Sequence, residues 1–451
     1  MWLKRAPQFL QYVGKVFGLF TFLEQYKDFR KEPEIPAGIL LWILLLGIWG
    51  RVGSLNQLEE MGKDGELDEA VSFPRKPSAD TLGRGLALGD AKAAWAYNYD
   101  ITRKARRNKA FPGGGTINGL MVAAIDGTEY YNTERPSRVA RDGWSQRSKT
   151  VHRQKENVTV TEYYERGVAI SYVGVQPRLQ LGEERIQPGS GEQTTALRLI
   201  DELDRFHGWH WCDLLTTDSG FVSGPFINAV RARHKHVLVK VKQEKMLIVK
   251  EANAEFSGRE PSIVLRDATC LTPEERDANE VNGRPRYRYQ VRIWDGEGFC
   301  MWSQVREPLR LLRIEEVRQV CRVGTWHDEA PQTYYIATTM PRAILPSETV
   351  WLIMHRRWDI ENSLFNDLKQ NWGLRHCYTQ DPNGIRMLMA LVAIARNLML
   401  LFAYRRLRRQ DQRRTLTALI RQVVRGILIG LGPNGRRTRW RRTRPAYLDS
   451  G

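Results

Sequence analysis

The first 110 residues place apolar positions at the three- and four-residue spacing of amphipathic helices. The predicted helices are Phe9–Phe29, the almost wholly apolar Ile39–Trp49, Leu55–Met61, a segment from Ser78 to Ala87, and one from Asp90 to about Arg107. Ser78 and Asp90 are suitable N-caps. Pro112 and the triplet Gly113–Gly115 then interrupt the pattern. We therefore predict a helical N-terminal region over residues 1–112.

After the glycines the pattern changes to short apolar runs of strand length. The run Leu120–Ile125 has the continuous apolar character of a strand that is buried on both faces. The elements predicted after it are a hairpin of Val158–Tyr164 and Val168–Val173 that turns near Arg166-Gly167, a helix from Glu192 to Phe206, a strand Cys212–Thr217, a helix from Pro225 to Arg233, and a strand Val237–Val241. This order predicts an α/β fold over residues 116–242, in which helices flank a mixed sheet.

Residues 243–345 carry short β-type segments separated by polar turns. The predicted strands are Tyr287–Trp294, Phe299–Val305, Leu311–Arg322 and Thr333–Thr339, and the predicted turns include Asn282-Gly283 and Asp295-Gly296. We predict an antiparallel β-rich insertion of about a hundred residues, because every connection is short.

The next segment, Pro346–Gly373, contains no internal glycine or proline and predicts about seven uninterrupted turns of helix. Ser347 is its predicted N-cap, and Glu348 lies in the first turn, where the helix dipole favours an acid. The side chains predicted for its apolar face are Met354, Trp358, Phe365, Leu368 and Trp372. A second strongly apolar helix, Asn383–Tyr404, completes a core segment of residues 346–404.

Glu361 occupies one position of that apolar face, between Trp358 and Phe365. An ionised carboxylate in such a place is costly unless a cation meets it. Arg357, one turn earlier, is one candidate, and a bound metal ion is the other. The helix alone leaves both possibilities open.

Charge is the most informative bulk property of the 451-residue chain, which has a net charge of +18. From Arg405 to Arg444 there are 14 arginines and one acid, Asp411, so residues 405–451 form a basic tail. Basic residues also crowd the segment 135–155. The cluster Arg103–Lys109 makes the N-terminal region a candidate for DNA binding or dimerisation, and a merely solvated basic face is the alternative. This surplus indicates a polyanionic partner, with nucleic acid the first candidate.

Cysteine spacing and apolar runs exclude several other classes of protein. The five cysteines show no metal-ligand spacing, and the longest apolar run, Gly38–Gly50, is too short to span a bilayer. We therefore expect a cytoplasmic, nucleoid-associated protein that does not enter a membrane.

Two aspartates share a sequence context that points to metal chemistry. Asp126 and Asp218 each follow an apolar strand and precede a small residue. Sites in open α/β sheets lie at strand ends, so neighbouring strands would bring the two carboxylates together, with Glu361 as a third. Three carboxylates without Cys or His suit two Mg²⁺ or Mn²⁺ ions. Such ions promote phosphodiester cleavage.

Five stretches resemble the DDE transposases of bacterial insertion sequences, of the cut-and-paste type with a Y-R-E-K signature. They are PSADTLGRGLALGD, VAAIDGTEYYNT, PGSGEQTTALRLIDEL, DLLTTDSGFVSGPFINAV and RRWDIENSLFNDLKQ. The resemblance implies a ribonuclease-H-like catalytic core interrupted by the β-rich insertion. It also implies Asp126, Asp218 and Glu361 as the catalytic, metal-binding acids.

The family's helix signature is a Tyr, an Arg three residues on, a Glu four further and a Lys seven beyond. Here these positions are Met354, Arg357, Glu361 and, one residue late, Lys369. On an α-helix seven residues return to within about 20° of the Glu, whereas eight point about 80° away. The DNA-binding residues that we predict are Arg357, Lys369, Arg147, Lys149, Arg153, Lys155 and Trp294, the last because relatives stack a flipped base on an aromatic of the insertion. Core packing is the competing interpretation of Trp294.

The resemblance implies a transposase that binds terminal inverted repeats, cleaves the ends by metal-dependent hydrolysis and joins the 3′-OH ends to target DNA. A homodimer is expected in the synaptic complex with double-stranded DNA. Two alternatives are a metal-dependent endonuclease on the same fold and a catalytically inactive DNA-binding regulator. The long insertion and the basic tail argue against the first, and the presence of all three acids argues against the second.

Overall fold

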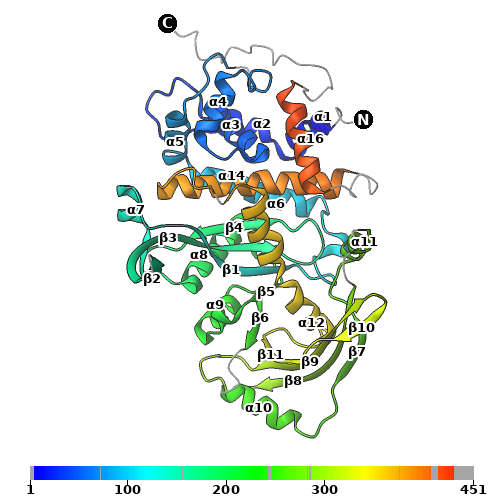
Figure 1. The fold of residues 1–451 in the computed structure, drawn as a ribbon. Helices are drawn as coiled ribbons and strands as arrows, with labels where there is room; N and C mark the ends of the chain where they lie inside the picture. The colour runs from blue at the N-terminus through cyan, green and yellow to red at the C-terminus, as the bar shows by residue number, and fades with distance from the viewer. Residues whose placement is uncertain are drawn as a thin grey trace.

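The protein is stacked in three parts, which we describe from a computed structural model. A helical layer lies at one end, a sheet with flanking helices lies in the middle, and the insertion lies at the other end (Figure 1). The structure describes residues 5–430 except 72, 154–155, 242–245, 282, 284–285, 375 and 408–414. The predicted turn at Asn282, Lys155 and most of the basic tail lie outside the described residues.

The helical layer joins both ends of the described chain. Its N-terminal elements are α1 (Arg5–Tyr12), η2 (Val13–Phe17), α2 (Leu19–Gln25), α3 (Ala37–Gly50), α4 (Leu55–Lys63), α5 (Ala79–Ala87) and α6 (Ala91–Arg107). The single helix predicted for Phe9–Phe29 is wrong, because Gly18 adopts a left-handed φ of 71° and divides it. Ser78 and Asp90 cap α5 and α6 as predicted.

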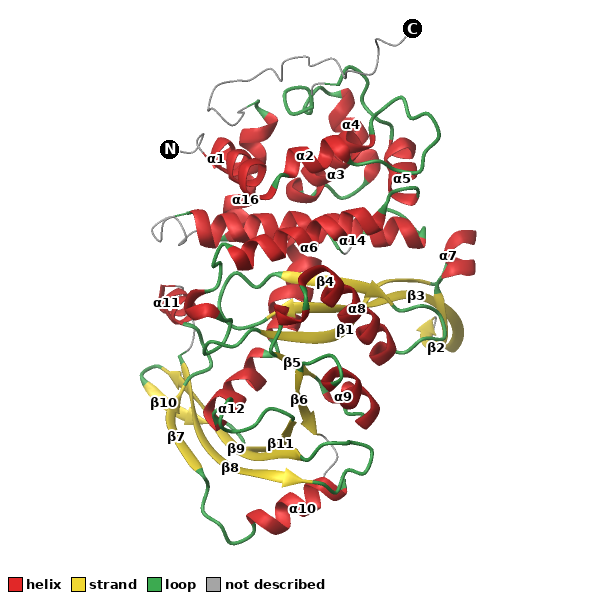
Figure 2. Ribbon diagram, turned by 180° about the vertical axis from the view of Figure 1, so that it is seen from behind, coloured by secondary structure: helices red, strands yellow, loops and turns green. Residues whose placement is uncertain are grey.

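Helix α14 (Pro382–Leu401) crosses the molecule between the helical layer and the sheet (Figure 2). It packs on α3, α5 and α6, and the Trp49 indole donates to the Ala395 carbonyl over 3.1 Å. The apolar stretch Pro382–Arg406 is long enough to cross a membrane, but 94% of an 18-residue apolar window within it is buried inside the protein. It is therefore a core helix. Helix α16 (Leu416–Leu428) returns to pack on α1 and α3.

The central sheet has the strand order β4-β3-β1-β5-β6. Its strands are β1 (Val122–Thr133), β3 (Glu156–Tyr172), β4 (Gln180–Arg185), β5 (Leu214–Thr217) and β6 (His236–Val241). β3 is antiparallel to β1, whereas β5 is parallel to β1 and β6 is parallel to β5. Helices α8 (Glu192–His207) and α9 (Gly224–Arg231) pack beside these strands. This is the predicted ribonuclease-H-like arrangement, and the predicted fold class is confirmed.

The hairpin predicted near Arg166-Gly167 is wrong. β3 continues straight through Gly167, and its hairpin partner is β2 (Ser145–Arg153), which follows the short helix α7 (Arg138–Gly143). Gly167 serves packing here, because a Cβ at this position would clash with the side chains of Glu183 and Tyr130.

The insertion extends the central sheet to eleven strands within the described residues. Its elements are α10 (Leu247–Phe256), β7 (Ile263–Ala268), α11 (Pro273–Val281), β8 (Tyr287–Phe299), β9 (Leu309–Arg322), β10 (Thr325–Asp328) and β11 (Gln332–Thr338). β11 pairs antiparallel with both β9 and β6, so the insertion is continuous with the core. The strand predicted for Phe299–Val305 is absent from the structure, in which Phe299 ends β8 and a turn follows over residues 303–304.

The predicted turn at Asp295-Gly296 is also wrong, because both residues lie inside β8. The Asp295 side chain is fully buried, and Arg310 donates to it over 2.6 and 3.0 Å. Arg342 and the Ser347 hydroxyl complete its contacts. The Asp295 carboxylate can therefore be buried within a strand. Through Ser347 it also connects the insertion to the first residue of the next helix, α12 (Ser347–Arg356).

Removing this buried partner should destabilise the protein strongly. We expect Asp295→Ala to lower the free energy of unfolding by about 3–5 kcal/mol, because Arg310 is left buried without its counter-charge. Thermal melting and urea midpoints followed by circular dichroism measure the loss. Asp277→Ala, an exposed position on α11 of the insertion, is the control and should melt as wild type. Equal melting of the two variants would contradict this role for Asp295.

Candidate active site

Asp126 and Asp218 lie side by side, because their strands are parallel neighbours. Ile125 of β1 pairs with Thr217 of β5. Asp126 directly follows Ile125, and Asp218 directly follows Thr217. β5 ends there, whereas β1 continues to Thr133 beside β3 alone. Local backbone fixes both carboxylates, since Asp126 accepts from the Gly127 amide and Asp218 from the Gly220 amide, each over 2.8 Å.

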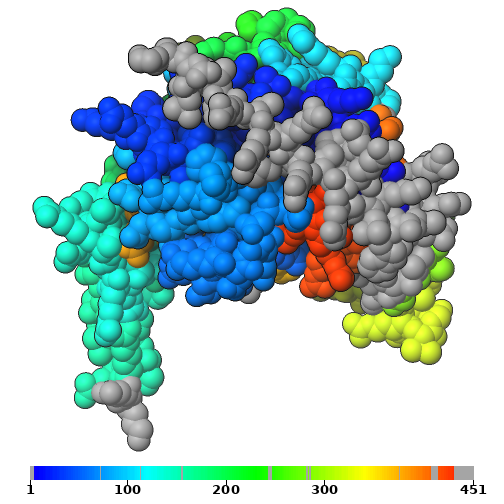
Figure 3. Space-filling model, turned by 90° about the horizontal axis from the view of Figure 1, so that it is seen from above, coloured from blue at the N-terminus to red at the C-terminus, as the bar shows by residue number. Residues whose placement is uncertain are grey.

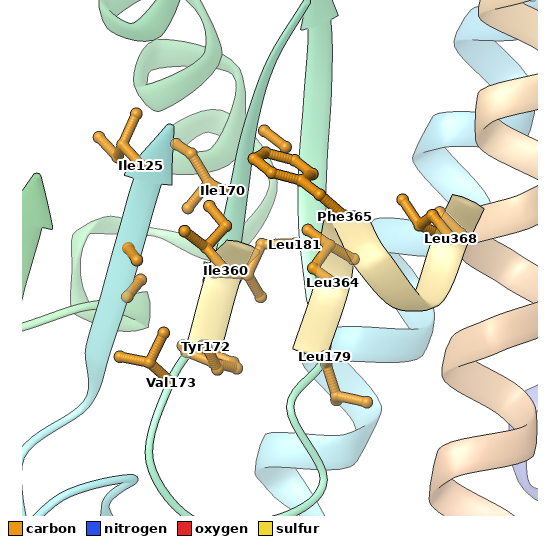
Figure 4. Packing of buried hydrophobic residues seen from close by; sticks show 14 of the residues in the cluster. Ile125, Ile170, Tyr172, Val173, Leu179, Leu181, Ile360, Leu364, Phe365 and Leu368 are labelled. Atoms are coloured by element: carbon orange, nitrogen blue, oxygen red, sulfur yellow. The ribbon is translucent and has the colours of Figure 1, made fainter. Parts of the chain in front are cut away.

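Asp126 points to the sheet face opposite α8. A Cβ on the next residue, Gly127, would meet Glu192 of α8, and successive side chains of a strand alternate in direction. The element on the Asp126 face is the helical segment that carries Glu361. Figure 4 shows Ile360, Leu364 and Phe365 of that segment packed against the sheet.

That segment is not the uninterrupted α-helix that the sequence predicts. It consists of α12, a π-helical turn η6 (Ile360–Phe365) and α13 (Asn366–Asn371). Ser347 is its first helical residue and not its N-cap, because the hydroxyl bonds Asp295 instead. Trp358, predicted for the apolar face, is 48% exposed.

The π turn accounts for the late position of Lys369. Its i→i+5 bonds accommodate one more residue than an α turn. Glu361 lies in this turn and Lys369 lies after it, so the extra residue offsets the extra spacing. The phase of Lys369 is then the one that seven residues give on an α-helix, within about 20° of Glu361.

Arg357 lies between the acids of the two elements. Its Nη1 is 3.6 Å from Asp126 Oδ2 and 3.3 Å from Glu361 Oε1. One nitrogen therefore contacts both carboxylates, and the distance between the two oxygens cannot exceed the sum of these two distances. The guanidinium is 4.6 Å from the centre of the Trp358 ring, and the side chain is only 5% exposed. The sequence left open whether Arg357 or a metal ion is the partner of Glu361. In this structure Arg357 supplies the positive charge, at the place between the carboxylates where a metal ion would bind.

The electrostatics of the site show a shortage of positive charge. The pKa of the Asp126 carboxyl is raised from 3.8 to about 7, chiefly by burial and also by the negative charges of Asp218 and Glu361, against the opposing charge of Arg357. Carboxylates gathered in this way fit a divalent cation, which prefers oxygen ligands. In the described part of the chain, no three His, Cys, Asp or Glu side chains already stand in a metal-holding group. Arg357 separates Glu361 from Asp126.

A buried ionic network holds the start of the Glu361 segment, and the sequence did not reveal it. Arg356 donates to both Asp359 oxygens over 2.7 and 2.9 Å and to Glu275 of α11. Arg178 contacts Asp359 and Glu275 from the loop between β3 and β4. Burial alone would raise the pKa of Glu275, but hydrogen bonds and charge from Arg356 and Arg178 lower it to about 2.

Two arginines also support the π turn itself. Arg396 of α14 donates to the Ser363 carbonyl over 2.6 Å and to Asp367 over 2.9 Å. Arg178 donates to the Ser363 hydroxyl over 2.7 Å. Since Glu361 lies two residues before Ser363, these contacts position the acid through the backbone. The sequence contains one sign of this support, which is the presence of Arg396 inside an apolar helix.

The predicted DNA-binding residues lie in different environments. Arg147 and Lys149 of β2 both pair with Glu162, and Arg147 also pairs with Glu129. Arg153 pairs with Glu134. The acids come from β1, β3 and the loop after β1. These three basic side chains are therefore already paired within the protein, which the sequence of the segment itself does not show.

Trp294 is packed within the insertion, an environment that favours the competing interpretation, and its contact with DNA stays a prediction. It lies on β8, is 8% exposed and donates its indole N–H to the Arg259 carbonyl over 2.8 Å. Arg313 and Arg292 lie 4.9 and 5.6 Å from its ring centre. The exposed tryptophan beside the acids is Trp358, which the apolar stripe had assigned to the core.

Comparison with known proteins shows similarity to a protein family and to solved structures. Residues 184–398 match the family model described as the transposase DDE domain. The match supports a DDE transposase, and it includes Asp218 and Glu361, whereas Asp126 lies before it. No curated protein sequence matches the chain.

One of these structures is the piggyBac transposase synaptic complex with hairpin DNA, determined by cryo-electron microscopy. It is 11% identical, with a TM-score of 0.42, and the alignment covers 94% of this chain and 79% of that one. Similarity at this level does not assign residues or function.

The raised pKa of Asp126 predicts how stability depends on pH in the absence of metal. The folded pKa lies above the ordinary value, so the contribution to stability is complete at low pH and is lost as pH rises through about 7. The loss amounts to up to about 4 kcal/mol. We expect Asp126→Asn to melt above wild type at pH 8 in EDTA, with the difference shrinking toward pH 5.

Melting curves at pH 5 to 8 check this expectation. Asp277→Asn, at an exposed position, is the control and should follow the wild-type pH profile. If Asp126→Asn instead lowered the melting temperature equally at every pH, Asp126 would be a structural partner of Arg357 and not a strained acid.

Proposed function

We propose that this chain is the transposase of a bacterial insertion sequence, acting on the terminal inverted repeats and on target DNA. The observation that carries the proposal is the convergence of Asp126 and Asp218, at neighbouring strands, with Glu361 across the Arg357 guanidinium. The match to the transposase DDE domain supports the same reading. The helix signature in the Y-R-E-K form agrees with it, with Met354 at the Tyr position.

Asp126, Asp218 and Glu361 are the residues that would hold Mg²⁺ or Mn²⁺, because all three offer hard carboxylate oxygens. Two such ions supply an activated water or 3′-OH nucleophile and stabilise the leaving oxygen in phosphodiester chemistry. The strand-end backbone amides of Gly127 and Gly220 hold two of the acids in place. The Arg178 and Arg396 contacts to Ser363 hold the third.

Neighbouring side chains are suited to the DNA itself. Arg357 has a planar guanidinium that binds phosphate oxygens in pairs, and Lys369 is in phase with Glu361 as a point charge for a second phosphate. The exposed face of Trp358 suits stacking on an unpaired base. The net charge of +18 favours duplex DNA as partner, and a homodimer would place two ends in one synaptic complex. The protein would act in the cytoplasm, at the nucleoid.

Glu361→Gln tests the chemistry separately from the fold. The change keeps size and removes the charge that a divalent ion requires, so we expect cleavage and joining of pre-cleaved ends in Mg²⁺ to fall to background. Binding to duplexes carrying the flanking inverted repeats and the melting temperature should stay near wild type, because Glu361 is 36% exposed and Arg357 keeps Asp126. Glu348→Gln, at an exposed position in the first turn of α12, is the control and should retain both activities.

Each alternative predicts a different result in the same assay. Joining at near wild-type rate by Glu361→Gln would reject the catalytic assignment. A wild-type protein that cleaves and never joins would be the endonuclease. One that binds the ends and does neither would be the inactive regulator.

A further inference from the structure

The β2–β3 hairpin forms a two-stranded ribbon that projects from the body of the protein. Residues 145–153 pair with 156–164, and the ribbon stands out as a separate arm in Figure 3. Most of its side chains are exposed, because β1 pairs with β3 only as far as Tyr163 and no third strand is paired with the described residues beyond that point. An isolated two-stranded ribbon is only marginally stable in water, because it buries little apolar surface. A partner bound to one of its faces would stabilise it.

One face of the ribbon is charged, and its cations pair with Glu162 of the ribbon and with Glu129 and Glu134 of the body. Residues directly opposite on paired strands share a face, and the register places Arg147 opposite Glu162 and Arg153 opposite Glu156. Lys149 also reaches Glu162, which is only 3% exposed beneath the two cations. Val151 and Val160 of this face are half-buried among these side chains.

Among the described residues of the ribbon, the opposite face carries no carboxylate, lysine or arginine. Its residues are Gln146, Ser148, Thr150, His152, Asn157, Thr159 and Thr161, and all of them are exposed. His152 and Asn157 contact each other across the strands over 3.2 Å. We call this set the amide–hydroxyl face. It offers hydrogen-bond donors, acceptors and Thr methyl groups without charge.

The base of the ribbon is fixed to the body. Trp144 is buried, and its indole donates to the Gln380 carbonyl over 3.0 Å. Arg185 of β4 donates to Glu165 over 2.7 Å and also reaches the Gly143 carbonyl. The direction of the arm is therefore set by the same sheet that carries Asp126.

The distance from the acids follows from the register. Ala169 of β3 pairs with Asp126, and Thr161 and Asn157 lie eight and twelve residues farther along the strand. At about 3.4 Å per residue this is roughly 27 to 41 Å. The same length of duplex DNA holds roughly 8 to 12 base pairs.

We propose that the amide–hydroxyl face reads base edges in the major groove of duplex DNA, roughly 8 to 12 base pairs from the bond at the acids. The inference rests on the proposed function for the position of that bond. The major groove admits a two-stranded β-ribbon, and Ser, Thr, Asn and Gln pair with base edges there, while Thr methyls contact thymine. The face has no charge for phosphates, which the rest of the +18 chain binds.

A second copy of the chain is the less suitable occupant. Stable protein interfaces centre on aromatic or large apolar anchors. The exposed part of the amide–hydroxyl face has none, and Tyr163 at its base is only half-buried. The chemistry therefore matches bases better than a protein surface.

Two adjacent rungs of the ribbon provide a matched pair of variants. Thr150 faces Thr159 on the amide–hydroxyl face, and Val151 faces Val158 on the charged face. Thr150→Val with Thr159→Val removes two hydroxyls and keeps shape and charge. Val151→Thr with Val158→Thr makes the reverse change on the other side and is the control.

The probe is a pool of 60-base-pair duplexes with a randomised centre, from which wild-type protein selects its preferred sequence. We expect the Thr→Val double variant to lose at least about tenfold in its preference for the selected duplex over the unselected pool, because two hydroxyls that would bond base edges are removed. Its affinity for the unselected pool and the salt dependence of that affinity should match wild type. The control should keep the full preference.

A preference within twofold of wild type in the Thr→Val variant would overturn the inference, as would a wild type that selects nothing. Loss of self-association in sedimentation with intact DNA preference would assign the face to a second copy and would also overturn it. Melting temperatures equal to those of the control exclude misfolding. Cleavage of the selected duplex in Mg²⁺ by wild type is scored separately, so failure of the proposed function is seen independently of base preference.

Discussion

Carboxylates gathered at neighbouring strands repel one another, and the cations around them determine how this structure is arranged. Arg357 meets Asp126 and Glu361 directly. Behind it, Arg356 and Arg178 neutralise Asp359 and Glu275, and Arg396 neutralises Asp367. Because each of these arginines is nearly buried, none can leave its acid without leaving an unpaired charge in the interior. The Glu361 segment is consequently held from the sheet, from α14 and from the insertion at once.

The sequence predicted the parts of the fold that depend on local pattern. The apolar runs before Asp126 and Asp218 indicated buried strands, and the structure makes them parallel neighbours. Ser78 and Asp90 marked helix starts through cap chemistry that acts within three residues. These signals are short-range, so a single sequence carries them.

Other features depend on contacts between distant residues and could not be predicted. The π turn adds one residue to a helix whose composition remains helical, so only the unusual spacing to Lys369 hinted at it. Gly167 resembled a turn glycine, but Glu183 and Tyr130 on other strands require it. Asp295-Gly296 has the sequence of a turn, but it lies inside a strand because Arg310 neutralises the Asp295 carboxylate. The cations of β2 looked free because Glu162, Glu129 and Glu134 lie outside the basic segment.

The docking of α14 and α16 on the first helices has a consequence for synthesis of the chain. Trp49 hydrogen-bonds the Ala395 carbonyl, Tyr26 reaches Met387, and α16 covers α1, so the first fifty residues share a core with residues near 390 and 425. A ribosome adds about 5–20 residues per second. The α3 helix, apolar on all sides, therefore waits tens of seconds for its partners after it emerges. During that interval the nascent chain exposes its most aggregation-prone surface, and chaperone binding to α3 would protect it until translation ends.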